Sequence, residues 1–108
     1  MTTSELQVHF SRGYDSGNYA NAYESEYLAV VMPASLAEYC KAEGSLEKPA
    51  IDAWSTGFIL GFYSSYEWHE IPDVFVGSAV RAYRTALSAG WPTGREEDDE
   101  SEVPDVSI

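Results

Sequence analysis

Apolar side chains recur at helical spacing through the middle of the chain. Five of them follow one another at intervals of three or four residues: Ile51, Trp54, Phe58, Phe62 and Tyr66. This spacing places side chains on one face of an α-helix, whereas a half-buried strand needs strict alternation. We therefore expect a central helix over 50–68. Pro49 suits its first turn, and Pro72 ends the segment because residues before proline avoid the helical region.

Two glycines, Gly57 and Gly61, lie one turn apart beside this apolar stripe. Each costs about 1 kcal/mol relative to alanine inside a helix, so their presence predicts that another backbone approaches closely. Residues 10–16 repeat the pattern Phe-x-x-Gly-aromatic-x-Ser of residues 58–64. We interpret the match as two helices that cross at small residues. A faint internal repeat, or loop glycines that break the segment, are the alternatives.

Three further helices are expected, over 4–24, 33–43 and 73–89. Ser4 with Gln7 and Ser35 with Glu38 have the spacing of capping boxes, which mark helix starts. Gly44 and Gly90 are suited to helix C-termini. The first helix should bury one face, listed from its start as Leu6, Phe10, Gly13, Tyr14 and Gly17.

The last of these helices is predicted to begin at Asp73, whose carboxylate serves as its cap. Its inner face should carry four apolar residues: Val76, Val80, Tyr83 and Leu87. Arg81 and Arg84 then fall on the outer side. The helix from Pro33 should turn Leu36, Tyr39 and Cys40 inward.

A second interpretation of the N-terminal segment is a β-hairpin. Leu6, Val8 and Phe10 alternate with polar residues in a first strand, Tyr14 to Asn18 would form the turn, and residues 26–32 would form the second strand. The fold class expected first is mainly α, a small single-domain bundle of about four helices. The alternative is α+β with a short N-terminal hairpin.

The domain is expected to span residues 1–94, with an acidic, disordered tail over 95–108. The 108 residues suffice for one stable core. Eighteen acids against six bases give a net charge of −12, half of it in the tail. The other half must lie on the folded surface. Such a surface repels nucleic acid and anionic membranes and attracts basic proteins.

No residue pattern indicates catalysis, a cofactor or a metal site. Phosphate-binding glycine loops, nucleophile elbows and paired metal-ligand spacings are all missing from the sequence. His69 lies between Glu67 and Glu70, a cluster more typical of a solvated helix end than of a metal site. Cys40 has acids nearby, which disfavour its thiolate. We expect a protein that is not an enzyme.

The cellular compartment of the protein is predicted from the cysteine count and from the lack of targeting and membrane-spanning segments in the sequence. A single cysteine permits no internal disulfide and suggests a reducing compartment, and we expect a cytoplasmic protein. The N-terminus resembles no signal peptide, and no apolar run is long enough for a membrane span.

Tyrosine is unusually frequent, with eight residues in the chain. Tyr19, Tyr23 and Tyr27 recur at intervals of four, with Glu24 and Glu26 interleaved. Tyrosine is favoured at interfaces because it combines an apolar ring with a polar tip. Together with these glutamates they would make a mixed aromatic and acidic surface. Half-buried core tyrosines, with their hydroxyls at the water boundary, are the more ordinary interpretation.

These observations predict an acidic interaction protein that occupies a basic site on a nucleic-acid-binding protein. The expected contact residues are Glu24, Glu26, Glu67, Glu70, Asp73, Tyr19, Tyr23 and Tyr27. In character, the chain resembles the DNA mimics that phages and mobile elements direct against restriction or CRISPR systems, although no motif aligns. The alternative from another class is a homo-oligomeric structural or accessory domain, such as a homodimer with a tyrosine-rich interface. Its acidity would then serve solubility or a saline cytoplasm.

Overall fold

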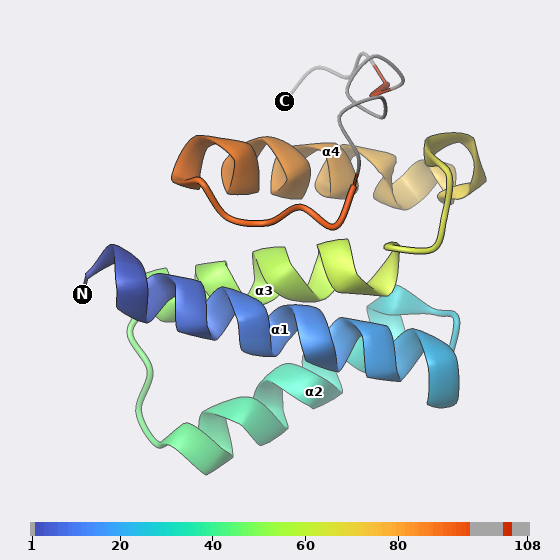
Figure 1. Ribbon diagram of the computed structural model, residues 1–108. Helices are drawn as coiled ribbons and strands as arrows, with labels where there is room; N and C mark the ends of the chain where they lie inside the picture. The colour runs from blue at the N-terminus through green and yellow to red at the C-terminus, as the bar shows by residue number, and fades with distance from the viewer. Residues whose placement is uncertain (1, 96–102, 105–108) are drawn as a thin grey trace.

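Four α-helices run through the part of the chain that the computed structural model describes, residues 2–95 and 103–104 (Figure 1). They are α1 (Thr3–Tyr23), α2 (Leu28–Glu43), α3 (Lys48–Phe62) and α4 (Asp73–Ala89), with a short 3-10 helix, η1 (Trp68–Glu70), before α4. No strand occurs among these residues, which confirms the mainly α prediction. The hairpin alternative is wrong, because α1 continues through Gly17 and Asn18 without a break.

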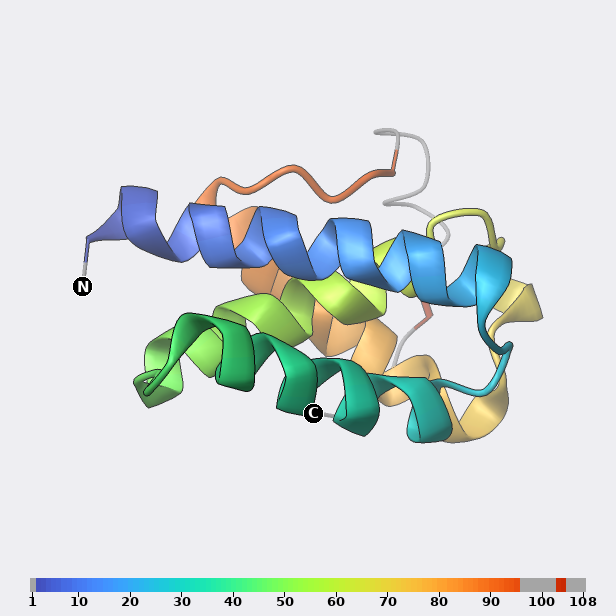
Figure 2. The same cartoon turned by 90° about the horizontal axis from the view of Figure 1, so that it is seen from below.

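The helices form three layers. α1 and α3 lie side by side and run in the same direction, both beginning at the left of Figure 1. α4 covers one side of this pair and α2 the other, as the view from below also shows (Figure 2). The two outer helices therefore present separate surfaces to solvent on opposite sides of the molecule.

Glycines allow the central pair to approach within backbone contact. A Cβ placed on Gly13 would lie 2.0 Å from the Trp54 carbonyl oxygen, and one on Gly61 would lie 2.1 Å from the Tyr14 carbonyl oxygen. Gly17 and Gly57 make equivalent approaches to the opposite helix. The predicted close crossing of the two glycine-bearing helices is confirmed.

Aromatic side chains fill the space around this crossing. Trp54, Phe58 and Phe62 are fully buried along α3, with ring centroids 5.0 and 6.1 Å apart in succession. Phe10 of α1 contacts Trp91, whose ring lies 5.0 Å away and belongs to the segment after α4. The predicted apolar stripe of the central helix is thus the core of the domain.

α3 is shorter than predicted, since it ends at Phe62 rather than at residue 68. Tyr63 leaves the helical conformation; its N–H donates to the Ile59 carbonyl at 3.2 Å, and the Ser64 N–H donates to the Gly61 carbonyl at 3.3 Å. The chain then turns so that η1 carries Trp68 back into the core, where the ring meets Tyr83 edge-on at 5.5 Å. Burial of this indole favours the turn over a continued helix.

α2 begins at Leu28, five residues before the predicted start at Pro33, which lies inside the helix. Proline lacks an N–H and usually breaks a helix interior. Here the added N-terminal turn buries Leu28 and Val31, which the helix would otherwise leave exposed. The predicted capping box at Ser35 is therefore wrong. Gly44 ends the helix with a positive φ of 84°, as expected.

The starts of α1 and α4 also differ from prediction. Thr2 caps α1 by accepting a hydrogen bond from the Glu5 amide, so the Ser4 box is not the start. Pro72 occupies the N-cap of α4, and Asp73 makes no capping bond with its side chain. Gly90 ends α4 in the left-handed conformation, as predicted.

Most of the inner faces were predicted correctly, with one exception on α4. Leu87 is 46% exposed although it was expected to face inward, whereas Ala79 and Ala86 are buried. Arg81 and Arg84 are exposed, as predicted.

The segment after α4 folds back over the core. The Arg95 guanidinium lies 4.2 Å from the Trp68 ring centroid and donates to the Tyr63 carbonyl at 3.0 Å. Val103 also packs against the core. Of the predicted disordered tail, 95–108, residues 96–102 and 105–108 lie outside the described residues.

Alkaline pH is expected to destabilise the fold through Tyr63. Its side chain is 2% exposed, its hydroxyl finds no hydrogen-bond partner within the described residues, and burial raises its pKa to about 12. The unfolded chain releases this proton near pH 10, so stability should fall as pH rises from 10 to 12. We expect a loss of roughly 2 to 3 kcal/mol, measured by urea unfolding at stepped pH. The Tyr63→Phe variant should lose clearly less over the same range; an equal loss would contradict this assignment.

Candidate functional site

An acidic groove of about 450 Å³ runs between α1 and α2. Its lining contains three carboxylates, two tyrosines and two serines, and no basic residue: Asp15, Ser16, Tyr19, Glu24, Ser35, Glu38 and Tyr39. We call this set the acidic groove. Carboxylates and phenol rings together are suited to ammonium and guanidinium groups, through charge-assisted hydrogen bonds and cation–π contacts.

The helical periodicity of α1 and α2 determines which of their residues line the two walls of the acidic groove. Gly13 and Gly17 turn one face of α1 toward α3, so Asp15, Ser16 and Tyr19 fall on other faces. On α2, the lining residues lie within one turn of one another, from Ser35 to Tyr39. Leu28 and Val31 are the buried residues of α2, and the part of the helix that follows them forms the second wall of the acidic groove.

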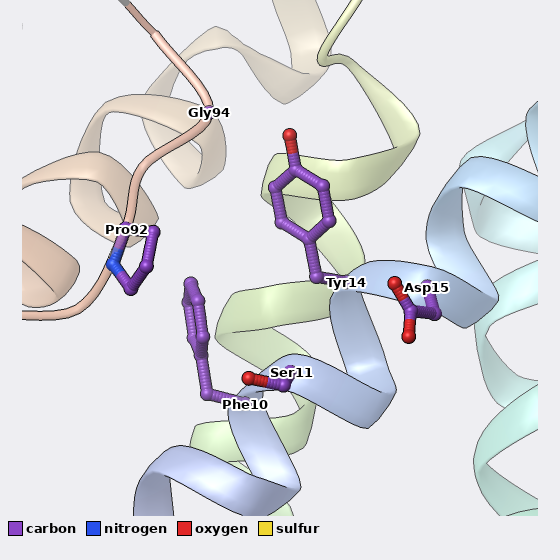
Figure 3. A pocket seen from close by; sticks show the side chains of 6 residues that line it. All are labelled: Phe10, Ser11, Tyr14, Asp15, Pro92 and Gly94. Carbon is purple, nitrogen blue, oxygen red and sulfur yellow. The ribbon is translucent and has the colours of Figure 1, made fainter.

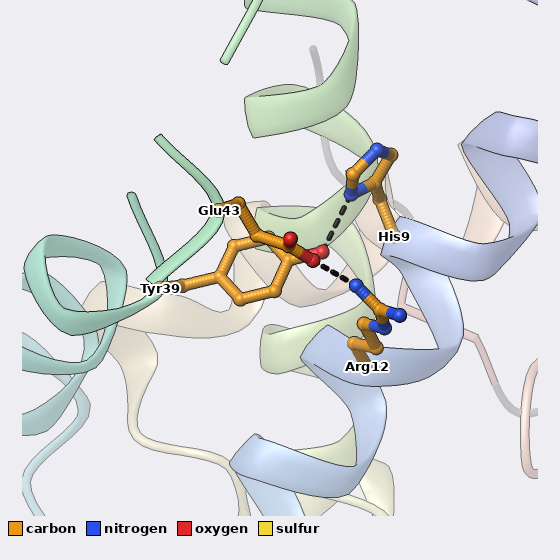
Figure 4. A network of polar contacts seen from close by, with 4 residues as sticks. All are labelled: His9, Arg12, Tyr39 and Glu43. Carbon is orange, nitrogen blue, oxygen red and sulfur yellow. Dashed lines mark hydrogen bonds and ion pairs between the residues drawn. The ribbon is translucent and has the colours of Figure 1, made fainter. Parts of the chain in front are cut away.

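Tyr39 is held in place by contacts with both central helices. Its ring stacks on Trp54 of α3 with centroids 5.5 Å apart, and its hydroxyl pairs with His9 Nδ1 of α1 at 2.5 Å (Figure 4). Beside it, Arg12 of α1 forms an ion pair with Glu43 of α2 (Figure 4). Burial raises the pKa of Tyr39, against the opposing effect of Arg12. This network fixes α2, and with it the groove.

The three tyrosines singled out by the sequence are exposed. Tyr19, Tyr23 and Tyr27 keep 58%, 78% and 64% of their surface accessible, so the half-buried alternative is wrong for them. The rings of Tyr19 and Tyr23 lie 5.0 Å apart. They extend the acidic groove toward the end of α1, where Val30 of α2 is also 65% exposed.

The five predicted carboxylates are all exposed, and they lie on segments that meet at one end of the bundle: Glu24, Glu26, Glu67, Glu70 and Asp73. Two hydrogen bonds connect these segments, Asn21 Nδ2 to the Tyr66 hydroxyl at 3.2 Å and Ser64 Oγ to Asn18 Oδ1 at 2.7 Å. Their use in binding stays a prediction.

One of these five already has a structural role. Glu70 accepts a hydrogen bond from the Glu67 amide at 2.8 Å, which caps η1. A partner that uses the Glu70 carboxylate therefore competes with this bond. The groove carboxylates Asp15, Glu24 and Glu38 make no side-chain bond within the described part of the chain, which leaves them available.

A smaller hollow of about 280 Å³ adjoins the groove on the other side of α1 (Figure 3). The Phe10 ring projects toward Pro92 and the Tyr14 hydroxyl toward Gly94, and Ser11 and Asp15 lie along the helix beside them (Figure 3). Asp15 lines both this hollow and the acidic groove, so it lies at the boundary between the two.

Sequence reasoning missed Asp15, Glu38 and Tyr39 as groove residues. Glu38 was assigned to a capping box and Tyr39 to the inner face of a helix. Asp15 lies four residues before Tyr19, a spacing that puts a carboxylate beside an exposed ring on a helix. The sequence therefore contained a signal for the α1 wall of the groove. The residues of the α2 wall could not be predicted, because they depend on where α2 packs.

No metal centre assembles in residues 2–95 and 103–104, where no three metal-ligating side chains converge. His69 is exposed, in the middle of η1. None of the helices in this part of the chain combines the length and apolarity required to cross a membrane. Searches against protein-family models, curated proteins and solved structures found no match to the chain.

Proposed function

We propose that this protein is a cytoplasmic interaction module whose acidic groove binds a basic protein surface. The observation that carries the proposal is the groove lining itself, with three carboxylates, two tyrosines and no base. The exposed Tyr23 and Tyr27 and the carboxylates at the same end of the bundle extend the surface. Exposed aromatic rings surrounded by acids supply contact area and charge complementarity to a basic partner.

The partner we favour is a nucleic-acid-binding protein, whose basic site this chain would occupy as a DNA-mimic inhibitor of the kind phages and mobile elements make. Carboxylates three or four residues apart on a helix lie about 5–6 Å apart, on the scale of phosphate spacing along a nucleic acid strand. Asp15 and Glu38 face the groove from different helices, so negative charge is spread over two walls as it is over two strands.

A competition experiment tests this proposal. The partner is recovered from a bacterial lysate on immobilised protein, eluted with a salt gradient and identified by mass spectrometry. It is then loaded with a labelled oligonucleotide and titrated with this protein. We expect displacement of the oligonucleotide, because both ligands require the same basic site. A ternary complex of all three on a native gel would contradict the mimic mechanism.

A second function is supported by the exposed apolar side chains at one end of the bundle. Tyr19, Tyr23, Tyr27 and Val30 are suited to a symmetric contact between two copies, as in a structural or accessory homodimer. Sedimentation velocity at high salt, which screens the charge repulsion between copies, distinguishes the two functions. A dimer that forms under these conditions and is lost in a Tyr23→Ser, Tyr27→Ser variant would favour this second function.

A further inference from the structure

Basic residues gather on the side of the molecule opposite the acidic groove. Acids outnumber bases three to one in the whole chain, yet α4 carries no acid after Asp73 and two exposed arginines, Arg81 and Arg84. Because α4 and α2 cover opposite sides of the α1–α3 pair (Figure 1), this basic side is separate from the proposed protein-binding surface.

A groove of about 480 Å³ lies between α3 and α4. The polar groups that line it are mostly hydrogen-bond donors: Lys48, Ser55, Thr56, Ser78, Arg81 and Thr85. Ile59 and Ala82 supply apolar lining. Past Arg81 and Thr85, a second hollow of about 520 Å³ continues to Arg84 and Ser88.

The ionised groups of the groove are two cations, Lys48 and Arg81, against one acid. Asp52 is the one acid in its lining, and its carboxylate is already paired with Lys48 at 2.6 Å. Thr56 donates its hydroxyl hydrogen to the Asp52 carbonyl. Within the described residues, the side chains of Arg81, Ser55, Ser78 and Thr85 make no hydrogen bond or ion pair. One guanidinium and three hydroxyls that can donate therefore line one groove without a partner in the described part of the protein.

Helix periodicity aligns these groups. On α4, Ser78, Arg81 and Thr85 follow at intervals of three and four residues and lie on one stripe. On α3, Ser55 and Thr56 are within one turn of Asp52 and Ile59 on the facing stripe. The guanidinium therefore lies among hydroxyls from both helices.

We propose that this groove binds a small phosphate-bearing molecule, with the phosphate at Arg81 between the hydroxyls of Ser78 and Thr85. A phosphate ester carries about −1.5 to −2 charge at pH 7 and three strong acceptor oxygens, the groups that the groove lacks. Arginine matches phosphate geometry with two parallel donors, and serine and threonine hydroxyls supply additional ones. Ile59 and Ala82 contact the remainder of the ligand.

The net charge selects a small ligand over a polyanion. At −12, the whole molecule repels a nucleic acid strand along its length, whereas a small dianion responds mainly to the charges within a Debye length of about 8–10 Å. The groove volume is in the range of small-molecule sites, roughly 300–1,000 Å³.

The test uses inorganic phosphate and phenyl phosphate, titrated into ¹⁵N-labelled full-length protein at constant ionic strength and pH 7.5. We expect saturable amide shifts in Ser55, Thr56 and residues 78–85. Arg81→Gln should weaken binding about tenfold or more, since a charge-assisted hydrogen bond is lost. Thr85→Val should weaken it less. Circular dichroism of each variant confirms that these exposed substitutions leave the fold intact.

The matched control is Lys41→Gln, which makes the same charge change at an exposed position on α2, outside the groove. Its affinity should stay within about twofold of the parent, because its charge is screened from the groove. An equal loss in both variants would show that only net charge matters and would overturn the proposal. Shifts that do not saturate, or shifts centred elsewhere, would also overturn it. A twelve-nucleotide single strand that bound the groove more tightly than phenyl phosphate would also overturn the proposal, because it would identify a nucleic acid contact.

Discussion

Gly61→Leu should destabilise the domain by at least about 3 kcal/mol, the largest effect on stability we expect from a single substitution. The ideal Cβ position at Gly61 lies 2.1 Å from the Tyr14 carbonyl oxygen and 2.8 Å from its carbonyl carbon. Both are backbone atoms of α1, so no side-chain rotation relieves the clash. The two central helices must separate, and the aromatic packing around their crossing is lost with them.

Urea unfolding followed by circular dichroism at 222 nm measures this effect, and α4 supplies the control. Gly77 lies inside a helix, and a Cβ there would meet no atom within 4 Å. Gly77→Ala should therefore stabilise the domain by about 0.5–1 kcal/mol, because alanine is the better helix former. A Gly61→Leu protein that unfolds at the urea concentration of the parent would show that the helices do not cross at this glycine.

Reversal of two groove carboxylates should cause the largest loss of binding. In the double variant Asp15→Lys, Glu38→Lys, each wall of the acidic groove presents a cation to a basic partner. Attraction becomes repulsion at two facing positions, and we expect the affinity for the recovered partner to fall about a hundredfold or more. Isothermal titration calorimetry at physiological salt measures the change.

The matched control is Glu5→Lys, Glu47→Lys, which makes the same change of net charge at exposed positions outside the groove. Its affinity should fall by much less, since distant surface charges are screened. A third variant reverses Glu67, Glu70 and Asp73, the carboxylates that the sequence indicated, and should show an intermediate loss. If the control loses as much affinity as the groove variant, binding depends on overall charge and the groove is not the site.

The approach of the two central helices was predictable from sequence, because its cause is local. Gly57 and Gly61 lie one turn apart in an apolar helix, where glycine has no favourable local role. Only a neighbouring backbone compensates for that cost, and the structure places Tyr14 there. Gly44 and Gly90 marked helix ends for an equally local reason, since both adopt positive φ.

Exposure of Tyr19 near the end of α1 was also predictable from periodicity. Tyr19 lies two residues after Gly17, on the opposite side of the helix, so it could not enter the crossing. Tyr27 lies beyond α1, at the N-cap of α2. Helical periodicity does not predict which other helix packs beside an exposed face. The acidic groove exists because α2 lies against that side of the pair, and its position depends on the Tyr39 contacts with Trp54 and His9.

The start of α2 and the end of α3 differ from the predicted boundaries, because burial of apolar side chains outweighed the local helix-start and helix-stop preferences of the sequence. Pro33 and Ser35 indicate a helix start by local rules, yet α2 begins at Leu28 because the earlier turn buries Leu28 and Val31. α3 ends at Phe62 because the turn after it returns Trp68 to the core.

By itself, the sequence of this protein determined four helices, the close crossing of two of them and an acidic surface, since each follows from residues within a few turns of one another. Only the tertiary structure decided which carboxylates face a shared groove and which donors face another, because those pairings join residues on separate helices that are distant in the sequence.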